Sequence, residues 1–223
     1  MGKTAFALNI AMSHLKNGGV VDLFSLEMSE EQLLKRMLSA VARVNSKRWI
    51  DKNFSKEDYE KIVQAIGIMG KWTGVLNDRP AQTIAEIRST VRQSMKQYPN
   101  QPHLIVIDYL QLIQPIGHFE RHDLAIGEIT KQLKNIAKEY HVPVVLLSQL
   151  NRGVESRADK RPMMSDIRDS GSVEQDADMI ISLYRDDYYN QPSNPNSTSI
   201  VELNVLKNRN GQTGKVEVAF QKE

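Results

Sequence analysis

The run HLIVIDYLQLI at residues 103–113 constrains the fold most, because it is apolar almost throughout, with Asp108 as its one charged residue. A strand that is apolar on both faces is typical of the centre of a parallel sheet covered by helices on both sides. Residues 142–150 (VPVVLLSQL) and 178–185 (DMIISLYR) have the same character and predict a second and a third buried strand. We therefore expect an α/β domain with a mostly parallel sheet.

Helical patterns separate these strands, and a further short strand is expected at residues 20–27. The expected helices cover residues 4–16, a segment opened by Ser29-Glu30-Glu31, residues 56–69, residues 80–97 and residues 124–140. The C-terminal stretch 200–220 differs, since two alternating strands joined by a Gly-containing turn predict an antiparallel β-hairpin. One domain over residues 1–223 is the simplest interpretation of a chain of this length.

Composition excludes several classes of protein. No apolar run reaches the length of a membrane span, and the absence of cysteine excludes disulfides and thiolate zinc sites. The five histidines show no metal-binding spacing. A net charge of +2 is too small to identify a nucleic-acid-binding protein, so local clusters must carry that inference.

Polar residues end the expected strands at the edge where parallel sheets bind ligands. Glu27 ends the strand expected at residues 20–27, Asp108 ends the strand that begins at residue 103, and Gln149 ends the strand that begins at residue 142. Gly2-Lys3-Thr4 opens a helix from the same edge. These residue types suit a nucleoside triphosphate, because a helix N-terminus favours anions and lysine reaches the β- and γ-phosphates. The Thr4 hydroxyl and the Asp108 carboxylate suit Mg²⁺, Glu27 suits a base for water, and Gln149 suits a sensor of the γ-phosphate.

Structural alternatives exist for each residue. Glu27 alone is as well explained as a helix N-cap, and a Gly-Lys-Thr tripeptide alone can arise by chance. Asp108 is harder to explain structurally, because an acid at the end of an apolar strand requires a partner. The shared order and placement of the residues favour the nucleotide site.

Longer motifs point to a family. The segments GKTAFALNIA, FSLEMS, LIVIDYLQLI, VVLLSQLNR, DIRDSGSVEQDADMI and KNRNGQTG occur in this order. Across essentially its whole length the chain resembles the C-terminal motor domain of DnaB-type replicative DNA helicases. The resemblance implies a RecA-like fold, a homohexameric ring, hydrolysis of ATP with Mg²⁺ at subunit interfaces, and single-stranded DNA in the central channel. It also implies primase and helicase-loader partners and a cytoplasmic place of action, in a bacterial cell or as a phage protein acting there.

The resemblance also assigns roles to residues. Gly2, Lys3 and Thr4 match the end of the phosphate loop, Glu27 the catalytic base and Asp108 the acid on the Mg²⁺ side. Gln149 matches the residue that couples the γ-phosphate to the DNA loops. Lys207 and Arg209 match a basic finger that acts on the ATP of the neighbouring subunit; without the motif, two solvated residues beside a hairpin turn would be the better interpretation.

DNA contacts are expected on a long charged loop at residues 151–171. The resemblance implies phosphate contacts by Arg168, Asp169 and Gly171. The basic residues around them are Arg152, Arg157, Lys160 and Arg161. Contacts of this kind read the backbone and make binding sensitive to salt; the alternative is an ordinary exposed loop.

The sequence departs from the family at its start. The leading glycine and spacer of the phosphate loop are missing, as are the strand before them and the helical N-terminal domain. We therefore expect a motor domain interrupted within its phosphate loop, with weakened binding of ATP. Two further hypotheses are a filament-forming recombinase of the RecA/RadA type and a non-hydrolysing module for assembly or loader docking.

Overall fold

The computed structural model describes residues 2–168, 170–190 and 198–221, and these form two compact units. The parallel-sheet unit comprises residues 4–114 and 140–147. The antiparallel-sheet unit comprises the described residues within 1–3, 115–139 and 148–222. Each unit therefore combines segments that are far apart in the sequence.

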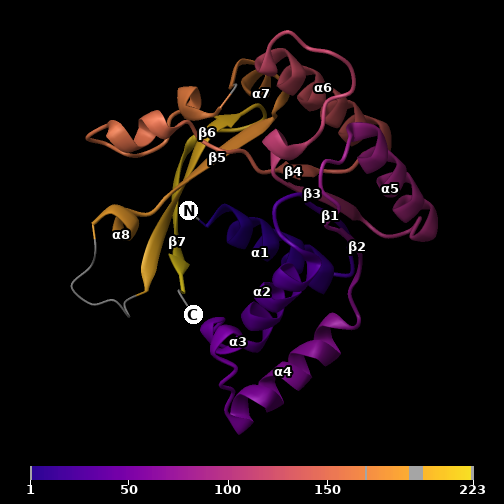
Figure 1. Cartoon of the computed structure of the whole chain (residues 1–223), viewed down its shortest axis with the longest axis vertical. Coiled ribbons are helices and arrows are strands. Elements are labelled where there is room, and N and C mark those ends of the chain that lie inside the picture. The colour runs from indigo at the N-terminus through magenta and orange to yellow at the C-terminus, as the bar shows by residue number, and fades with distance from the viewer. Residues whose placement is uncertain (1, 169, 191–197, 222–223) are drawn as a thin grey trace. The chain divides into compact units, whose positions relative to one another are not determined.

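The parallel-sheet unit is built on four parallel strands in the order β2-β1-β3-β4 (Figure 1). Their bounds are β1 Val20–Ser25, β2 Thr73–Asn77, β3 His103–Asp108 and β4 Val144–Leu146. All six residues of β1 and of β3 are buried, as expected for central strands. The register places Ser25 beside Asp108, so these two strands end at the same edge.

The observed strands are shorter than the apolar runs that predicted them. β3 ends at Asp108, as predicted, and Leu110–Leu112 in the remainder of the apolar run forms a 3-10 turn (η1). β2 was not predicted, because the sequence TGVLN forms a short, half-buried edge strand without clear periodicity.

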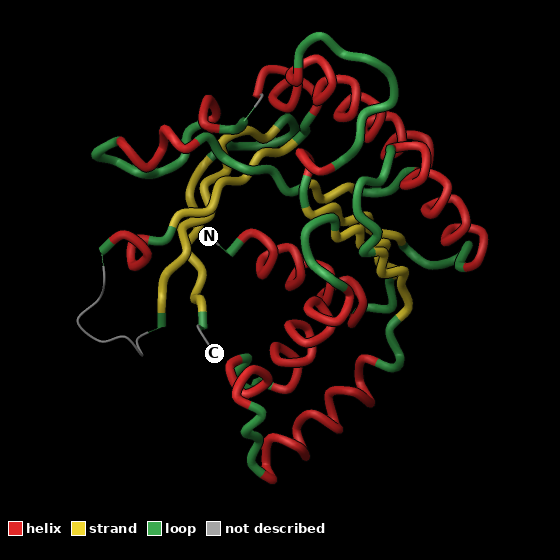
Figure 2. The backbone as a smooth tube through the Cα atoms, viewed as in Figure 1, coloured by secondary structure: helices red, strands yellow, loops and turns green. Residues whose placement is uncertain are grey.

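Helices cover both faces of this sheet, as the tube view shows (Figure 2). α1 and α2 bury residues such as Leu8 and Met37 in one cluster with Val106 of β3. α5 lies against β1 on the opposite face and buries Ile87 and Val91 completely. The helices of this unit are α1 Lys3–Lys16, α2 Glu30–Ala42, α3 Lys47–Asp51, α4 Lys56–Met69 and α5 Ile84–Gln97.

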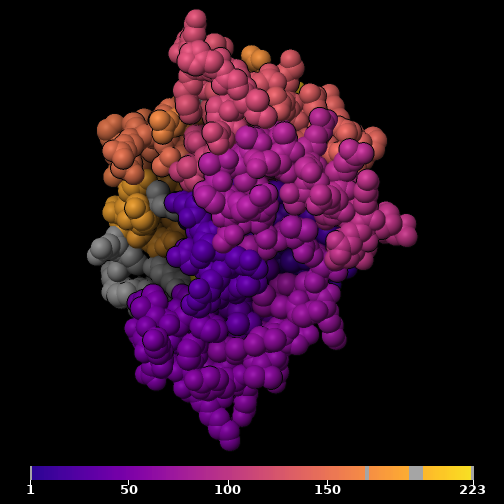
Figure 3. Space-filling model, turned by 45° about the vertical axis from the view of Figure 1, so that its right-hand side comes forward, coloured from indigo at the N-terminus to yellow at the C-terminus, as the bar shows by residue number. Residues whose placement is uncertain are grey.

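The start positions of three helices have a local cause. Ser29, Ser55 and Thr83 each form a capping box at the first turn of α2, α4 and α5, respectively. In a capping box the hydroxyl accepts a backbone N–H while the third helical residue bonds back to the cap. One face of this unit, coloured from indigo to magenta, is visible in the space-filling view (Figure 3).

The antiparallel-sheet unit contains three strands in the order β5-β6-β7. Its elements are α6 His122–Tyr140, α7 Ser170–Asp176, α8 Asp186–Tyr189, β5 Met179–Tyr184, β6 Ser199–Asn208 and β7 Gly214–Phe220. The hairpin of β6 and β7 confirms the prediction for residues 200–220. The prediction that residues 178–185 add a strand to the parallel sheet was wrong, because β5 pairs antiparallel with β6 and alternates between exposed and buried residues.

The described residues of the loop 151–171 contain more local structure than the sequence predicted. The loop contains the 3-10 turns η2 Arg152–Ser156 and η3 Met164–Asp166, and α7 begins at Ser170. An antiparallel bridge between Leu150 and Ile167 closes its base. Among the described residues, every helix is too short or too polar to cross a bilayer.

Candidate functional site

The edge of the parallel sheet brings two predicted residues into contact. The Thr4 hydroxyl of α1 donates a hydrogen bond of 2.7 Å to Oδ2 of Asp108, the last residue of β3. The Leu26 N–H donates to the Asp108 carbonyl at 2.8 Å, which extends the pairing of β1 and β3 past Ser25. Asp108 is 5% exposed, so its carboxylate depends on this edge for its hydrogen-bond partners.

Glu27 lies in the turn that leaves the same edge. It is exposed and follows Ser25 by two residues. The Ser25 hydroxyl donates to the Met28 carbonyl at 2.7 Å and accepts from the Met28 N–H at 3.3 Å. This tight turn fixes the backbone on both sides of Glu27. Ser25 was not predicted to shape the site, although serine hydroxyls commonly form hydrogen bonds with nearby backbone groups in turns.

The Gly-Lys-Thr segment opens α1. Gly2 has a φ of 76°, a conformation that favours glycine, and α1 begins at Lys3. The Lys3 ammonium donates to the Ser148 carbonyl at 2.7 Å, within the antiparallel-sheet unit. Since a backbone carbonyl can belong to any residue type, side-chain patterns could not have predicted this partner.

The pair of Thr4 and Asp108 fits a magnesium ion chemically. Mg²⁺ prefers hard oxygen ligands and is usually held by one or two protein side chains together with phosphate and water. Within the described residues, no group of three His, Cys, Asp or Glu side chains could hold a metal ion. A magnesium ion at Thr4 and Asp108 would therefore need phosphate or water to complete its ligands.

The predicted sensor and one predicted DNA contact lie side by side in the antiparallel-sheet unit. The Arg168 N–H donates to the Gln149 carbonyl at 3.2 Å, next to the bridge of Leu150 and Ile167. Gly171 is the second residue of α7, and a Cβ at this position would meet no atom within 4 Å. Asp169, the remaining predicted phosphate contact, lies outside the described residues.

The basic loop is largely tied to its own unit. Arg157 holds Asp166 through two hydrogen bonds of 3.0 and 2.6 Å. Burial raises the pKa of the Asp166 carboxyl, but the Met163 N–H and Arg157 outweigh this effect and lower the pKa overall. The Lys160 ammonium lies 4.5 Å from the ring centre of Tyr189.

The other two cations of the loop differ from each other. Arg161 forms a forked pair with Glu202, with both hydrogen bonds at 2.8 Å. Arg152 is exposed at the start of η2. Of the four predicted cations, two are thus held in forked ion pairs with acids that the sequence analysis had not singled out. A lone acid in the apolar strand IVELNVL was the available signal for Glu202.

The predicted finger residues contact the C-terminal end of α7. Lys207 donates to the Glu174 carbonyl, and Arg209 donates to the Gln175 carbonyl at 3.1 Å. Arg209 also pairs with Asp178 at 3.2 Å. Cations are favoured at a helix C-terminus because the last carbonyls lack partners within the helix. A hydrogen bond from Lys134, with the nearby charges of Arg209 and Lys207, lowers the pKa of Asp178.

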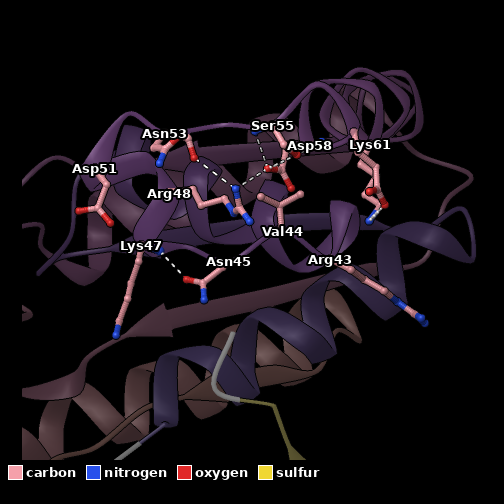
Figure 4. Close-up of a pocket in the computed structure, with 11 residues that line it drawn as sticks. Arg43, Val44, Asn45, Lys47, Arg48, Asp51, Asn53, Ser55, Asp58 and Lys61 are labelled. Carbon is pink, nitrogen blue, oxygen red and sulfur yellow. Dashed lines mark hydrogen bonds and ion pairs between the residues drawn. The ribbon is translucent and has the colours of Figure 1, made fainter. Parts of the chain in front are cut away.

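A surface hollow of about 590 Å³ lies elsewhere, among α2, α3 and α4 (Figure 4). Arg48 and Asp58 form an ion pair of 2.8 Å in it. Lys47 and Arg43 line the hollow but extend away from each other. None of the predicted site residues lines this hollow.

A parallel sheet covered by helices on both faces, with polar residues at the carboxyl ends of its strands, is typical of nucleotide-binding α/β domains. The sequence model of the DnaB-like helicase C terminal domain matches residues 1–223, and the chain belongs to this family.

Individual relatives agree with this assignment. The chain is 47% identical over 225 residues to "Replicative DNA helicase DnaC" of Bacillus subtilis (strain 168), covering 100% of this chain and 49% of the relative. A solved structure described as an ATPase domain is 40% identical with a TM-score of 0.91, over 98% of this chain and 77% of that one. A structure described as "The Structure Of A DnaB-Like Replicative Helicase And Its Interactions With Primase" is 41% identical with a TM-score of 0.93, over 100% and 55%. The chain thus spans about half the length of the curated relative.

Proposed function

We propose that this chain is the ATP-hydrolysing motor of a replicative DNA helicase that forms a homohexameric ring and moves along single-stranded DNA. The observation that carries the proposal is the contact of Thr4 with Asp108 at the edge where α1 begins. Helix N-termini bind phosphates, and a hydroxyl beside a carboxylate suits the magnesium ion of ATP. The membership of the chain in the helicase family supports the choice of substrate.

Each residue of the edge then has a defined task. Lys3 would leave the Ser148 carbonyl and donate to the β- and γ-phosphates, while Gly2 allows the backbone N–H groups to approach them. Thr4 and Asp108 would hold Mg²⁺, which neutralises charge on the phosphate oxygens when it is bound. Glu27 takes a proton from the attacking water, since its exposed carboxylate leaves a turn at the same edge.

DNA binding is assigned to the antiparallel-sheet unit. Arg168 and Gly171, with Asp169, would contact phosphates of the single strand. The hydrogen bond from the Arg168 N–H to the Gln149 carbonyl supports a coupling role for Gln149, because a shift of either residue moves the other. Binding through the phosphate backbone should weaken steeply with salt.

Lys207 and Arg209 are proposed to act on the ATP of the neighbouring subunit. A cation supplied from outside stabilises the charge of the transition state and links turnover to assembly. The Arg209 side chain is 51% exposed, which supports its availability to a neighbour. Primase and a helicase loader are proposed partners of the whole protein, and a structure similar to this chain describes interactions with primase. The bacterial source of the curated relative supports action in the cytoplasm, where bacterial DNA lies.

The proposal is tested by ATP hydrolysis of the full-length protein with and without single-stranded DNA. We expect DNA to stimulate turnover, and Glu27→Gln to lower it by about 10²-fold or more while ATP still binds. Glu30→Gln is the matched control, because it removes an exposed acid three residues away at the start of α2.

The outcomes separate the alternatives. Normal turnover in Glu27→Gln would refute the catalytic base. ATP binding without turnover in the unmodified protein would favour an assembly module, and open filaments on DNA in place of closed rings would favour a recombinase.

A further inference from the structure

The Arg161 guanidinium contacts one residue from each of two neighbouring strands, Glu202 of β6 and Tyr184 of β5. Its Nε and Nη2 atoms donate to Oε2 and Oε1 of Glu202, both at 2.8 Å. Its guanidinium also lies 4.7 Å from the ring centre of Tyr184. Tyr184 and Glu202 are direct cross-strand partners, so both contacts of Arg161 are made with residues of the sheet itself.

The two residues that contact Arg161 are largely shielded from water, whereas the Arg161 side chain is 46% exposed. The Glu202 side chain is 12% exposed and Tyr184 is 5% exposed. The hydrogen bonds from Arg161 lower the pKa of the Glu202 carboxyl. If Arg161 left for a DNA phosphate, Glu202 would keep only Lys215, at 3.6 Å, as an ion-pair partner among the described residues. Loss of the partner would leave the largely shielded Glu202 carboxylate without adequate compensation, which costs free energy, although the exposure of Arg161 reduces that cost.

Arg161 is also linked to the base of its loop. Arg157 donates to the Arg161 carbonyl at 3.0 Å and forms the forked pair with Asp166. The Asp166 carbonyl in turn accepts the Asn151 N–H at 2.7 Å, beside the bridge that precedes Arg168. The contacts therefore run without a gap from the sheet to the predicted phosphate-binding residue.

We propose that Arg161 is a positioning residue that anchors the loop 151–168 to β5 and β6, and that it does not itself bind DNA. Arg161 thereby holds Arg168 in place for the single strand, and this part of the inference rests on the proposed function. The loop cations would then divide into anchors, Arg157 and Arg161, and the residues that meet the phosphates.

Glu202→Gln tests the proposal, because the two roles of Arg161 predict opposite signs. If Arg161 is an anchor, loss of the carboxylate loosens the loop, and the affinity for a fluorescein-labelled oligothymidylate falls by about fivefold or more. If Arg161 binds DNA directly, the same change frees a cation and removes a negative charge, so affinity rises. That rise, or an unchanged affinity, would overturn the proposal.

Glu217→Gln is the matched control. Glu217 lies directly opposite Glu202 on β7, and its charge pairs with Lys215 and not with Arg161. The Glu217→Gln substitution removes one negative charge from the same face of the sheet as Glu202→Gln does, so we expect the affinity for DNA to change by less than about twofold. Arg161→Lys should behave like Glu202→Gln, since an ammonium keeps the charge but cannot form the fork.

Limited trypsin digestion without DNA separates failure of the anchor from failure of the proposed function. If Arg161 is an anchor, Glu202→Gln exposes the loop to cleavage at Arg152, Arg157 and Lys160, while Glu217→Gln does not. If the unmodified full-length protein fails to bind the oligothymidylate, the proposed function falls, and the digestion pattern still decides whether the anchor exists. Equal cleavage of all variants would overturn the anchor.

Discussion

The two units use their charged residues in different ways. In the parallel-sheet unit, Asp108 lies at the end of a buried strand, and the Thr4 hydroxyl beside it is a ligand type that suits a metal. In the antiparallel-sheet unit, Arg157, Arg161 and Arg209 each form an ion pair within the unit. A strand end fixes a side chain through the backbone, whereas a loop cation is fixed by whichever acid lies near it.

This difference predicts unequal consequences of mutation. Substitutions at the edge of the parallel sheet should impair the reaction itself. Substitutions of most cations in the antiparallel-sheet unit should instead displace the residues that these cations hold. Arg209 is the exception that tests the division most severely, because it has structural contacts in its own chain and a proposed catalytic role in a neighbouring one.

The largest expected effect is that of Arg209→Ala, which should lower DNA-stimulated ATP hydrolysis of the full-length protein by about 10³-fold. Mixing this variant with Glu27→Gln subunits should restore part of the turnover, because each variant supplies what the other lacks at a shared interface. Steady-state hydrolysis across mixing ratios measures this. Arg92→Ala, at an exposed arginine of α5, is the control. If no mixing ratio restored turnover, Arg209 would act only through its contacts with α7 in its own subunit.

A smaller effect compares the same substitution in the two sheets. Val106→Ala should lower the free energy of unfolding by roughly 2 kcal/mol, because Val106 of β3 is fully buried in the core. Val216→Ala on β7 should cost under about 0.5 kcal/mol, since Val216 is 57% exposed. Urea unfolding measures both values. Equal losses would show that the antiparallel sheet is buried in solution to the same extent as the parallel one.

The smallest effect concerns a buried acid away from the site edge. Asp22 of β1 is fully buried, and desolvation raises its pKa although His103 Nδ1 lies 3.4 Å from its Oδ2 atom. A carboxyl with a raised pKa in the folded state contributes stability that is fully present below its unfolded pKa and is lost as pH rises through the folded pKa. Asp22→Asn cannot ionise, so the variant should gain stability relative to the unmodified protein as pH rises from about 4.

Urea unfolding of both proteins between acidic and neutral pH measures this difference. Other acids have lowered pKa values and shift stability with pH in the opposite direction. Their contributions are the same in both proteins and cancel in the difference between them. A difference that stays constant with pH would mean that Asp22 ionises equally in the folded and unfolded states.

The parts of the fold that follow from long apolar runs could be predicted from the sequence. The helix at residues 56–69 agrees with α4, and the apolar run ending at Asp108 agrees with β3. The β2 strand and the pairing of β5 could not be predicted, because edge strands carry weak patterns and an apolar strand does not reveal its partner.

The site shows the same limit. Thr4 and Asp108 could be placed together because parallel strands end at a common edge. The anchoring of Arg161 by Glu202 joins residues 41 positions apart, and no local pattern connects them. Charge alone therefore does not reveal which loop cations are already paired with acids of their own chain.

The most direct test of the central claim is the effect of Mg²⁺ on ATP binding by the full-length protein. We predict that Mg²⁺ tightens binding in the unmodified protein, that Asp108→Asn removes most of this effect and leaves binding without Mg²⁺ nearly unchanged, and that Asp22→Asn, on the adjacent strand, retains it. An undiminished effect of Mg²⁺ in Asp108→Asn would contradict the assignment of Thr4 and Asp108 as the metal-holding pair.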